Sequence, residues 1–426
     1  MSFENSLDFA RSLDEKDPLK KYRSQFYFPQ HEGKNVIYFT GNSLGLQPKT
    51  TRSYIEEILK DWKELGVEGH FDAEKPWWDY HERFAEDLSK IVGAKPSEVT
   101  VMNTLTVNLH LLMVSFYRPT KKRFKIICEE KAFPSDQYMI ASQVRFHGFD
   151  PAEAIVELKK RKGEHNFRTE DILKTIREVG EECALVLIGG VNYYTGQVFD
   201  MKTITAEAKK QGAFVGWDLA HAVGNVKLNL HDWNVDFAAW CSYKYMNSGP
   251  GSASGCYVHE KYHGKSDIPR FEGWWGHNKE ERFLMASEFQ PEPNVNAWQI
   301  SNAPVLSMAP YLSSLKMFSE VGMDAIVEKR KRIVAYLEFI LNKVSEETKS
   351  DFEIITPEAP EERGTQLSVF LKGYGKKIFY FLTENGVSID WREPNVIRIA
   401  PAPLYCSYSD IYNFGELLKQ AIFAHK

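Results

Sequence analysis

The segment AFVGWDLAHAVGNVKLNLHDWNVDFAAWCSYKYMNSGPG, residues 213–251, decides the fold. It contains two short apolar runs, 213–217 and 236–241, and each run leads into residues with reactive side chains. Short apolar strands that alternate with helices are typical of a parallel sheet covered on both faces. Ligands of such sheets collect outside the carboxyl ends of the strands, so the residues after each run are candidates for a functional site.

Three of these residues are Asp218, His221 and Lys244. Taken alone, the ordinary explanations are an aspartate that caps a turn, a histidine in the core and a solvated lysine. Lys244, however, stands where a buried strand ends beside the glycine-rich turn 247–251, and desolvation there would lower its pKa and make it a nucleophile. The set suits pyridoxal phosphate, because a lysine holds that cofactor and an aspartate pairs with its protonated ring nitrogen.

The phosphate of such a cofactor needs a site of its own, and the turn MNTLTVN at 102–108 offers one. Thr104 and Thr106 place hydroxyl groups on the first turn of a predicted helix, where exposed N–H groups and the helix dipole attract an anion. In isolation, ordinary N-capping by threonine is the better explanation of the turn. Together with Lys244, the pattern favours a phosphate cradle.

Helix-period and strand-like segments alternate along the chain, which predicts an α/β fold. Strands are expected at 98–102, 124–128 and 184–189, and helices at 54–62, 77–92, 134–144, 169–179 and 203–211. After residue 302, long charged helices at 303–318 and 323–347 precede a strand, helix, strand, strand, helix set over 365–424. We therefore predict an N-terminal segment 1–60 that packs with the small domain, a large cofactor-binding domain 61–302 and a small α+β domain 303–426.

Composition excludes several classes of protein. The chain has 53 lysines and arginines against 58 aspartates and glutamates, a net charge of −5, which lacks the basic footprint of a nucleic-acid binder. No run approaches the roughly 20 apolar residues of a membrane span, and the N-terminus has no apolar signal stretch. Five cysteines without C-x-x-C spacing predict a reduced cytoplasmic protein with neither disulfides nor a zinc site.

Beyond single residues, a series of motifs in order along the chain resembles kynureninase from about Tyr38 to Tyr405. The motifs are YFTGNSLGLQP from Tyr38, TLTVNLHLL from Thr104, FPSD from Phe133, YYTGQ from Tyr193, DLAHAVGNV from Asp218, CSYKY from Cys241, GWWGH from Gly273, Ser301-Asn302 and RIAPAPLY from Arg398. A single motif of this kind is weak, but so many in one order are specific.

The resemblance implies a pyridoxal-phosphate enzyme of fold type I, with a mostly parallel sheet of the seven-stranded type, that forms homodimers with sites at the subunit interface. It implies that Lys244 carries the cofactor, Asp218 holds the ring nitrogen and Phe133 stacks on the ring. The rest of the implied cofactor shell is Leu105, Thr106, Pro134, Ser135, Asp136, His221 and Tyr243, with Trp274 and Asn302 reaching in from the partner subunit. Many relatives have serine where this chain has Gly189, so one contact is missing there.

The resemblance also implies the substrate contacts and the reaction. Arg398 would bind the α-carboxylate, a task that suits a planar and always charged guanidinium, while His70 and Asn302 would contact the aryl end. The expected reaction is hydrolytic cleavage of the Cβ–Cγ bond of L-kynurenine or its 3-hydroxy form, which yields anthranilate or 3-hydroxyanthranilate and L-alanine. Lys244 would move the α-proton, and Tyr194 or Tyr243, near the leaving group, would shuttle the proton that the remaining enamine takes up to release L-alanine. Tryptophan catabolism and NAD biosynthesis are the pathways that use this reaction.

Two other functions remain open from the sequence. A cysteine desulfurase or selenocysteine lyase shares the cofactor but needs a reactive cysteine on a mobile loop, whereas Cys128, Cys183, Cys241 and Cys256 fall in or beside predicted strands. A non-catalytic protein of the same fold would be expected to have lost the lysine or the aspartate, and both are present.

Overall fold

The computed structural model describes residues 3–425, and its large part is built on one seven-stranded sheet. The strand order is β4-β10-β9-β8-β7-β5-β6, and β10 is the one strand that runs antiparallel to its neighbours. The strands are β4 (Val99–Met102), β5 (Lys125–Glu129), β6 (Ile155–Leu158), β7 (Cys183–Gly189), β8 (Phe214–Asp218), β9 (Phe237–Trp240) and β10 (Ser254–Val258). The mostly parallel seven-stranded sheet predicted from the sequence is confirmed.

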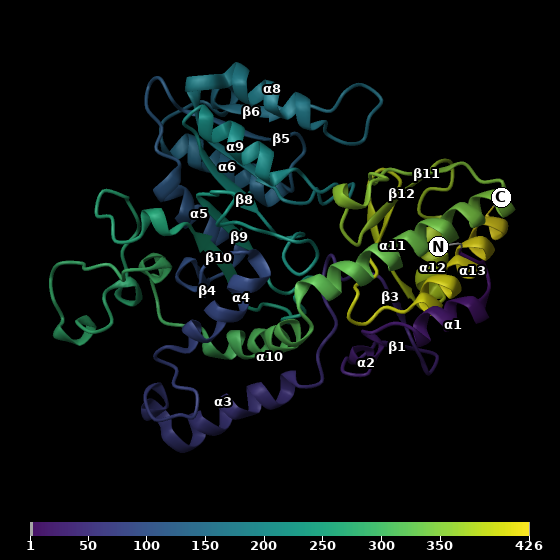
Figure 1. Cartoon of the computed structure of the whole chain (residues 1–426), viewed down its shortest axis with the longest axis horizontal. Coiled ribbons are helices and arrows are strands. Elements are labelled where there is room, and N and C mark those ends of the chain that lie inside the picture. Colours follow the sequence, from purple (N-terminus) through teal and green to yellow (C-terminus); the bar gives the residue numbers. More distant parts are fainter. Residues whose placement is uncertain (1–2, 426) are drawn as a thin grey trace.

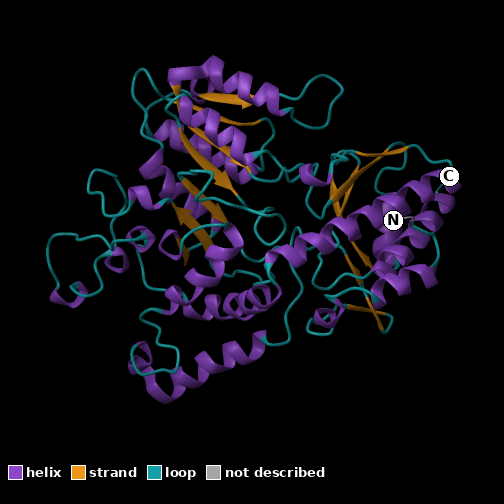
Figure 2. Ribbon diagram, viewed as in Figure 1, coloured by secondary structure: helices purple, strands orange, loops and turns teal. Residues whose placement is uncertain are grey.

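Helices cover both faces of this sheet, as Figure 2 shows. Along β7, Leu185 and Leu187 pack with one group of helices, whereas Val186 and Ile188 pack with the other. The first group is α5 (Leu105–Phe116), α6 (Pro134–Phe146) and α7 (Pro151–Ala154); the second is α4 (Ala85–Val92), α8 (Thr169–Val179), α9 (Met201–Lys210) and α10 (Val305–Val321). Burial on both faces explains why these strands read as continuous apolar runs instead of alternating ones.

A second, smaller sheet lies beside the first and is antiparallel throughout (Figure 1). Its order is β11 (Phe352–Ile354), β12 (Leu367–Leu371), β15 (Val396–Ile399) and β14 (Asp390–Arg392), with α11 (Met323–Thr348), α12 (Lys377–Glu384) and α13 (Tyr408–Ala424) around it. The N-terminal elements are α1 (Leu7–Glu15), α2 (Lys20–Arg23), the pair β1 (Gln30–His31) and β2 (Lys34–Asn35), and β3 (Ile37–Tyr38). Of these, α1 packs on α13, and β3 pairs with β13 (Val387–Ser388).

The predicted division into 1–60, 61–302 and 303–426 stays a prediction. Helix α3 (Thr51–Leu65) crosses the first boundary and packs on α10, which follows the second boundary but lies against the large part of the molecule. Helix α11 then leads into the small part and packs on α13. Residues 1, 2 and 426 of the predicted segments lie outside the described residues.

Several short elements differ from the predictions. The helix predicted at 77–92 is a 3-10 turn followed by α4, and residues 77–79 are not helical because Trp77 and Trp78 donate their N–H groups to Gly69 and His70. Strands β6, β10 and β11 were not predicted. The 3-10 helices are η1 (Gly66–His70), η2 (Tyr80–Phe84), η3 (Pro96–Glu98), η4 (Gly180–Glu182), η5 (Glu260–Tyr262), η6 (Trp274–Gly276), η7 (Arg282–Leu284), η8 (Val295–Trp298) and η9 (Pro360–Glu362).

Candidate active site

A cavity of about 330 Å³ lies where the carboxyl ends of the parallel strands face the small sheet. The large part contributes most of its wall, β14 and β15 contribute Arg392 and Arg398, and the N-terminal segment contributes Asn42 and Ser43. The remaining lining residues are Thr104, Leu105, Thr106, Glu129, Phe133, Ser135, Asp136, Gly189, Val191, Tyr193, Asp218, Ala220, His221, Tyr243 and Lys244. Most residues predicted to bind the cofactor therefore lie around one cavity.

Lys244 and His221 are in direct contact in this cavity. Lys244 Nζ lies 3.0 Å from His221 Nε2. Burial, and after it the charge of Lys244, lowers the pKa of His221 well below its usual value, so the imidazole is neutral and its Nε2 can accept a hydrogen bond from the lysine. The contact fixes the lysine side chain at the point where β8 and β9 end.

Three buried carboxyl groups face the same space. Asp218 is the last residue of β8, and its Oδ1 accepts a hydrogen bond of 2.8 Å from the N–H of Ala220. Burial raises the pKa of Asp136 well above its usual value, and the neighbouring Asp218 adds to this effect; burial raises the pKa of Asp218 too, while Lys244 opposes it. Burial also raises the pKa of Glu129 to about 7, although Asn192 donates a bond of 2.8 Å to its Oε2.

Glu129 was not predicted as a site residue. It is the last residue of β5, just as Asp218 is the last residue of β8. An acid directly after an apolar strand was therefore the signal that could have identified it.

The turn before α5 has the form of an anion cradle. Thr104 is the N-cap residue with an extended backbone, its side chain makes no capping hydrogen bond, and Thr104, Leu105 and Thr106 all line the cavity. The loop is held because Asn108 donates a bond of 2.8 Å to the carbonyl of Met102. The first N–H groups of this helix and the threonine hydroxyls can thus receive a phosphate group.

Phe133 supplies an aromatic face beside these polar groups. Its side chain lines the cavity and is 43% exposed, and its ring meets the ring of Tyr193 edge to face with centroids 5.3 Å apart. The combination of a lysine, a buried aspartate, an aromatic face and an anion cradle fits pyridoxal phosphate. Tyr193 was missed by the sequence reasoning, which singled out its neighbour.

Arg398 lies on the small-sheet side of the cavity and is 1% exposed. Its Nη1 donates to the carbonyl of Tyr193 at 2.6 Å, and its Nη2 donates to Asp390 Oδ2 at 2.5 Å. The predicted carboxylate-binding residue thus reaches the cavity with both terminal nitrogens already bonded.

The two candidate proton shuttles differ in position. Tyr243 lines the cavity next to Lys244, whereas Tyr194 is not among the residues that line it, and its carbonyl accepts a bond of 2.7 Å from Ser368 Oγ. Burial raises the pKa of both hydroxyl groups, so both keep their protons at neutral pH.

Four other predicted residues lie outside this cavity in the single chain. Pro134 is the first residue of α6, between two lining residues. His70 and Asn302 line a separate, mostly apolar cavity of about 430 Å³ with Trp62 and Trp77.

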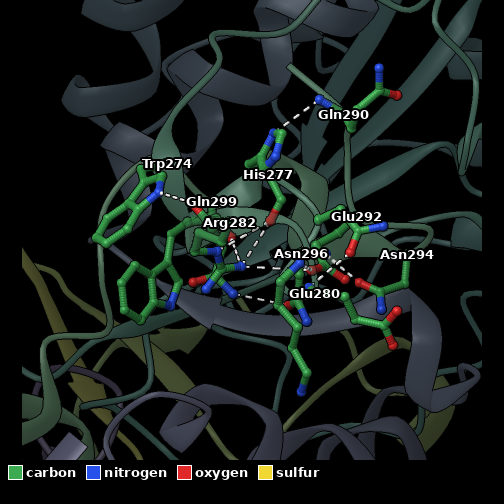
Figure 3. A network of polar contacts seen from close by, with 12 residues as sticks. Trp274, His277, Glu280, Arg282, Gln290, Glu292, Asn294, Asn296 and Gln299 are labelled. Carbon is green, nitrogen blue, oxygen red and sulfur yellow. Dashed lines mark hydrogen bonds and ion pairs between the residues drawn. The ribbon is translucent and has the colours of Figure 1, made fainter. Parts of the chain in front are cut away.

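Trp274 lies in the loop shown in Figure 3, where its Nε1 donates to the carbonyl of Arg282 at 3.1 Å. Arg282 is almost fully buried, donates to the carbonyls of Trp275 and His277, and lies over the ring of Trp78. The loop is thus braced from within, while the side chain of Trp274 is 48% exposed.

Among residues 3–425, one group could hold a metal ion, although no metal site was predicted: Glu98, His231 and His259 offer ligand atoms within 4.8 Å of one another. Glu98, however, already accepts hydrogen bonds from His231 Nδ1 and from the N–H groups of Lys95 and Glu260. Hydrogen bonding within the protein accounts for this cluster.

No helix among the described residues is long and apolar enough to cross a membrane.

The sequence matches known proteins along its length. Residues 329–418 match the family model described as the kynureninase C-terminal domain. The chain is 71% identical over 424 residues to a kynureninase of Christiangramia forsetii, covering 100% of both chains. It is 69% identical to a kynureninase of Flavobacterium psychrophilum, covering 99% of both, and 48% identical to a kynureninase of Nematostella vectensis, covering 98% of this chain and 94% of the other.

Solved structures with the same fold are more distant in sequence. A cysteine desulfurase from Thermococcus onnurineus superposes with a TM-score of 0.75 at 15% identity, covering 91% of this chain and 95% of the other. The cysteine desulfurase CsdA from Escherichia coli gives 0.77 at 13% identity, covering 96% and 99%. A C-DES mutant with glycine covalently linked to its pyridoxal-phosphate cofactor gives 0.76 at 16% identity, covering 93% and 98%. These neighbours confirm the predicted fold type I architecture.

Proposed function

The chain belongs to the kynureninase family, and from this membership we propose that it is a pyridoxal-phosphate-dependent hydrolase that cleaves the Cβ–Cγ bond of L-kynurenine or 3-hydroxy-L-kynurenine. The products are anthranilate or 3-hydroxyanthranilate and L-alanine. The observation that carries the proposal is the single cavity in which Lys244, Asp218, the cradle before α5 and Arg398 meet.

Each part of the cofactor has residues suited to it. Lys244 holds the cofactor covalently, Asp218 holds the ring nitrogen, Phe133 covers the ring, and the turn at Thr104 and Thr106 holds the phosphate. The bound cofactor supplies a protonated ring that stabilises negative charge at the substrate α-carbon.

Proton movement at the α-carbon is the task of Lys244. A lysine must be neutral to accept a proton, and the neutral His221, whose Nε2 lies 3.0 Å from Lys244 Nζ, accepts a hydrogen bond from the lysine and positions it in the cavity. Asp218 would stay ionised beside a bound cofactor with a protonated ring nitrogen, because opposite charges in a buried site favour the charged forms.

A tyrosine hydroxyl near the leaving aryl group supplies the proton that Cβ of the remaining alanyl fragment takes up when the Cβ–Cγ bond breaks. Tyr243 and Tyr194 are the two candidates, and the position of Tyr243 on the cavity wall favours it. Burial raises its pKa, so its hydroxyl is protonated and can donate at neutral pH.

The aryl end of the substrate site comes from a second subunit in this proposal. His70, Asn302 and Trp274 lie outside the cavity of their own chain, near large apolar side chains that are exposed: Trp62, Val67, Phe71, Leu284 and Met285. Exposed apolar surface of this extent is typical of a protein interface. A homodimer would cover it and bring the three residues to the cavity of the partner. Light scattering of the purified protein at micromolar concentration tests this, and a monomer would contradict it.

Activity with kynurenine tests the proposed reaction against the main alternative. Holoenzyme should release fluorescent anthranilate from kynurenine and no sulfide from cysteine. Burial raises the pKa of Cys128 and Cys183 to about 12, so neither suits the reactive thiol of a desulfurase. Sulfide release without anthranilate would overturn the proposal. Kinetics with kynurenine and with 3-hydroxykynurenine, measured in parallel, decide which of the two is the preferred substrate. This preference decides between a catabolic and an NAD-biosynthetic role. We propose that the protein acts in the cytoplasm.

A further inference from the structure

Two arginines and one aspartate occupy the same face of the pair of strands that closes the cavity. Asp390 and Arg392 lie two residues apart on β14, so both side chains point to one side of the sheet. Arg398 on β15 is the direct cross-strand partner of Asp390. All three side chains therefore meet, and Arg392 and Arg398 both line the cavity.

Asp390 holds this group together through one oxygen. Its Oδ2 accepts hydrogen bonds from Arg398 Nη2 at 2.5 Å, from Ser43 Oγ at 2.8 Å and from Arg392 Nη2 at 3.2 Å. Two guanidinium groups share one carboxylate, so this wall keeps one unbalanced positive charge. An anionic ligand would balance it.

Arg398 uses part of its donor capacity within the protein. It is 1% exposed, its Nη1 and Nη2 donate to Tyr193 and Asp390, and its Nε is buried without a hydrogen-bond partner. A carboxylate taken out of water has about four acceptor positions on its two oxygens, more than the remaining donors of one guanidinium fill, so a second guanidinium beside it strengthens binding.

Arg392 is placed to provide the missing donors. Its side chain is 36% exposed, and the bond of 3.2 Å to Asp390 is long for a charge-assisted pair. Its Nε is buried and has no hydrogen-bond partner. Its charge also acts on His221 and Tyr193, which line the same cavity.

We propose that Arg392 is a second substrate-binding residue, which contacts the α-carboxylate of the substrate together with Arg398, and that Asp390 positions both guanidinium groups. The inference rests on the proposed function for the identity of the ligand. It assigns the carboxylate to a pair of arginines on adjacent strands instead of to one residue.

Binding of two unreactive or slowly reacting ligands to the holoenzyme tests the proposal by calorimetric titration. The first ligand is 4-(2-aminophenyl)-4-oxobutanoate, which has the carboxylate of kynurenine but no α-amino group. The second is the amine that remains when kynurenine loses its carboxylate. The variants are Arg392→Gln, which removes the charge, and Arg392→Lys, which keeps the charge without the planar fork. Lys376→Gln is the matched control, because Lys376 forms a surface ion pair with Glu393 next to Arg392.

Arg392→Gln should raise the Kd of the carboxylate ligand by about tenfold or more and leave the Kd of the amine within about twofold. Arg392→Lys should lie between this variant and the wild type, and Lys376→Gln should match the wild type for both ligands. The visible spectrum of the bound cofactor should not change in any variant. Equal effects on both ligands, or none on the first, would overturn the proposal, and loss of the cofactor would mean that Arg392 serves the phosphate.

The Arg392 side chain is 36% exposed, so its replacement leaves no buried cavity, and Arg392→Lys gives a second, milder variant if Arg392→Gln is poorly soluble. The ligand titrations can be interpreted whether or not the proposed function is correct. If the wild type fails to cleave kynurenine, the function is wrong, while the ligand titrations still report on the carboxylate site.

Discussion

Two groups of predicted site residues behave differently in the structure. The inner group, with Asp218, His221 and Lys244, converges on one cavity, whereas the outer group of His70, Trp274 and Asn302 lies on other surfaces. The inner residues follow strands of one sheet, so the fold of a single chain brings them together. The outer residues lie on loops and short 3-10 turns, and the fold of a single chain leaves them outside this cavity. We therefore expect a partner subunit to bring them to it.

The largest effect expected is that of Lys244→Ala on the inner group. Loss of the amine should abolish the visible absorbance of the covalently held cofactor and reduce turnover by about a thousandfold or more, because the attachment point and the base for the α-proton are lost together. Absorbance spectroscopy and anthranilate fluorescence measure the two losses. Lys227→Ala is the control, since Lys227 is an exposed lysine paired with Asp324. Unchanged turnover in Lys244→Ala would remove the inner group from the chemistry.

The outer group should behave as residues supplied by a partner. Asn302→Ala should keep the cofactor absorbance yet lose most turnover. The variant can be unfolded and refolded together with inactive Lys244→Ala, and about half of the resulting dimers are then hybrids. In each hybrid, one of the two sites combines an intact Lys244 with an intact Asn302. About a quarter of wild-type activity should therefore return. Activity assays before and after mixing decide the matter. No recovery, with hybrids verified by mass spectrometry, would place both groups in one chain.

Arg398→Gln should have a smaller effect, confined to the substrate. The kcat/KM for kynurenine should fall by about a hundredfold while the cofactor absorbance persists, because the arginine faces the small-sheet side of the cavity. Steady-state kinetics on variants with verified cofactor content provide the measurement. Loss of cofactor at the same time would move Arg398 to the phosphate.

The smallest effect concerns the stability of the folded protein and involves Glu129, which lines the same cavity as the inner group. An unfolded glutamate ionises near pH 4.5, but Glu129 in the folded protein keeps its proton to about pH 7. Between these values the unfolded state loses a proton that the folded state retains, so stability falls as pH rises and the loss is complete above about pH 7. Glu129→Gln removes this dependence.

Urea unfolding of cofactor-free protein at several pH values tests this. Relative to the wild type, Glu129→Gln should gain on the order of 2 kcal/mol between pH 4.5 and pH 7.5. The exposed Glu153→Gln variant should show no such gain. A constant difference between Glu129→Gln and wild type across this range would show that the carboxyl group ionises normally.

Local sequence patterns predicted the inner group well, since acids and a lysine directly after apolar runs mark strand ends of a parallel sheet. They missed β10, because Gly255 gives that strand a turn-like composition. Gly255 is required there by packing: a Cβ at this position would lie 2.2 Å from the ring of Trp240. They also missed Tyr193 and Arg392, whose relevance depends on how the small sheet docks on the large one.

The place of β10 between β4 and β9 has a consequence for biosynthesis. The turn proposed to bind phosphate follows β4, and Lys244 follows β9. These two strands are not paired with each other but are joined by β10, which comes later in the chain than both. In β10, Gly255 pairs with Val101 of β4 on one side and with Trp240 of β9 on the other. A nascent chain cannot assemble the pocket until Val258 has left the ribosome. Binding of a cofactor that contacts both Thr104 and Lys244 would therefore depend on completion of the large sheet.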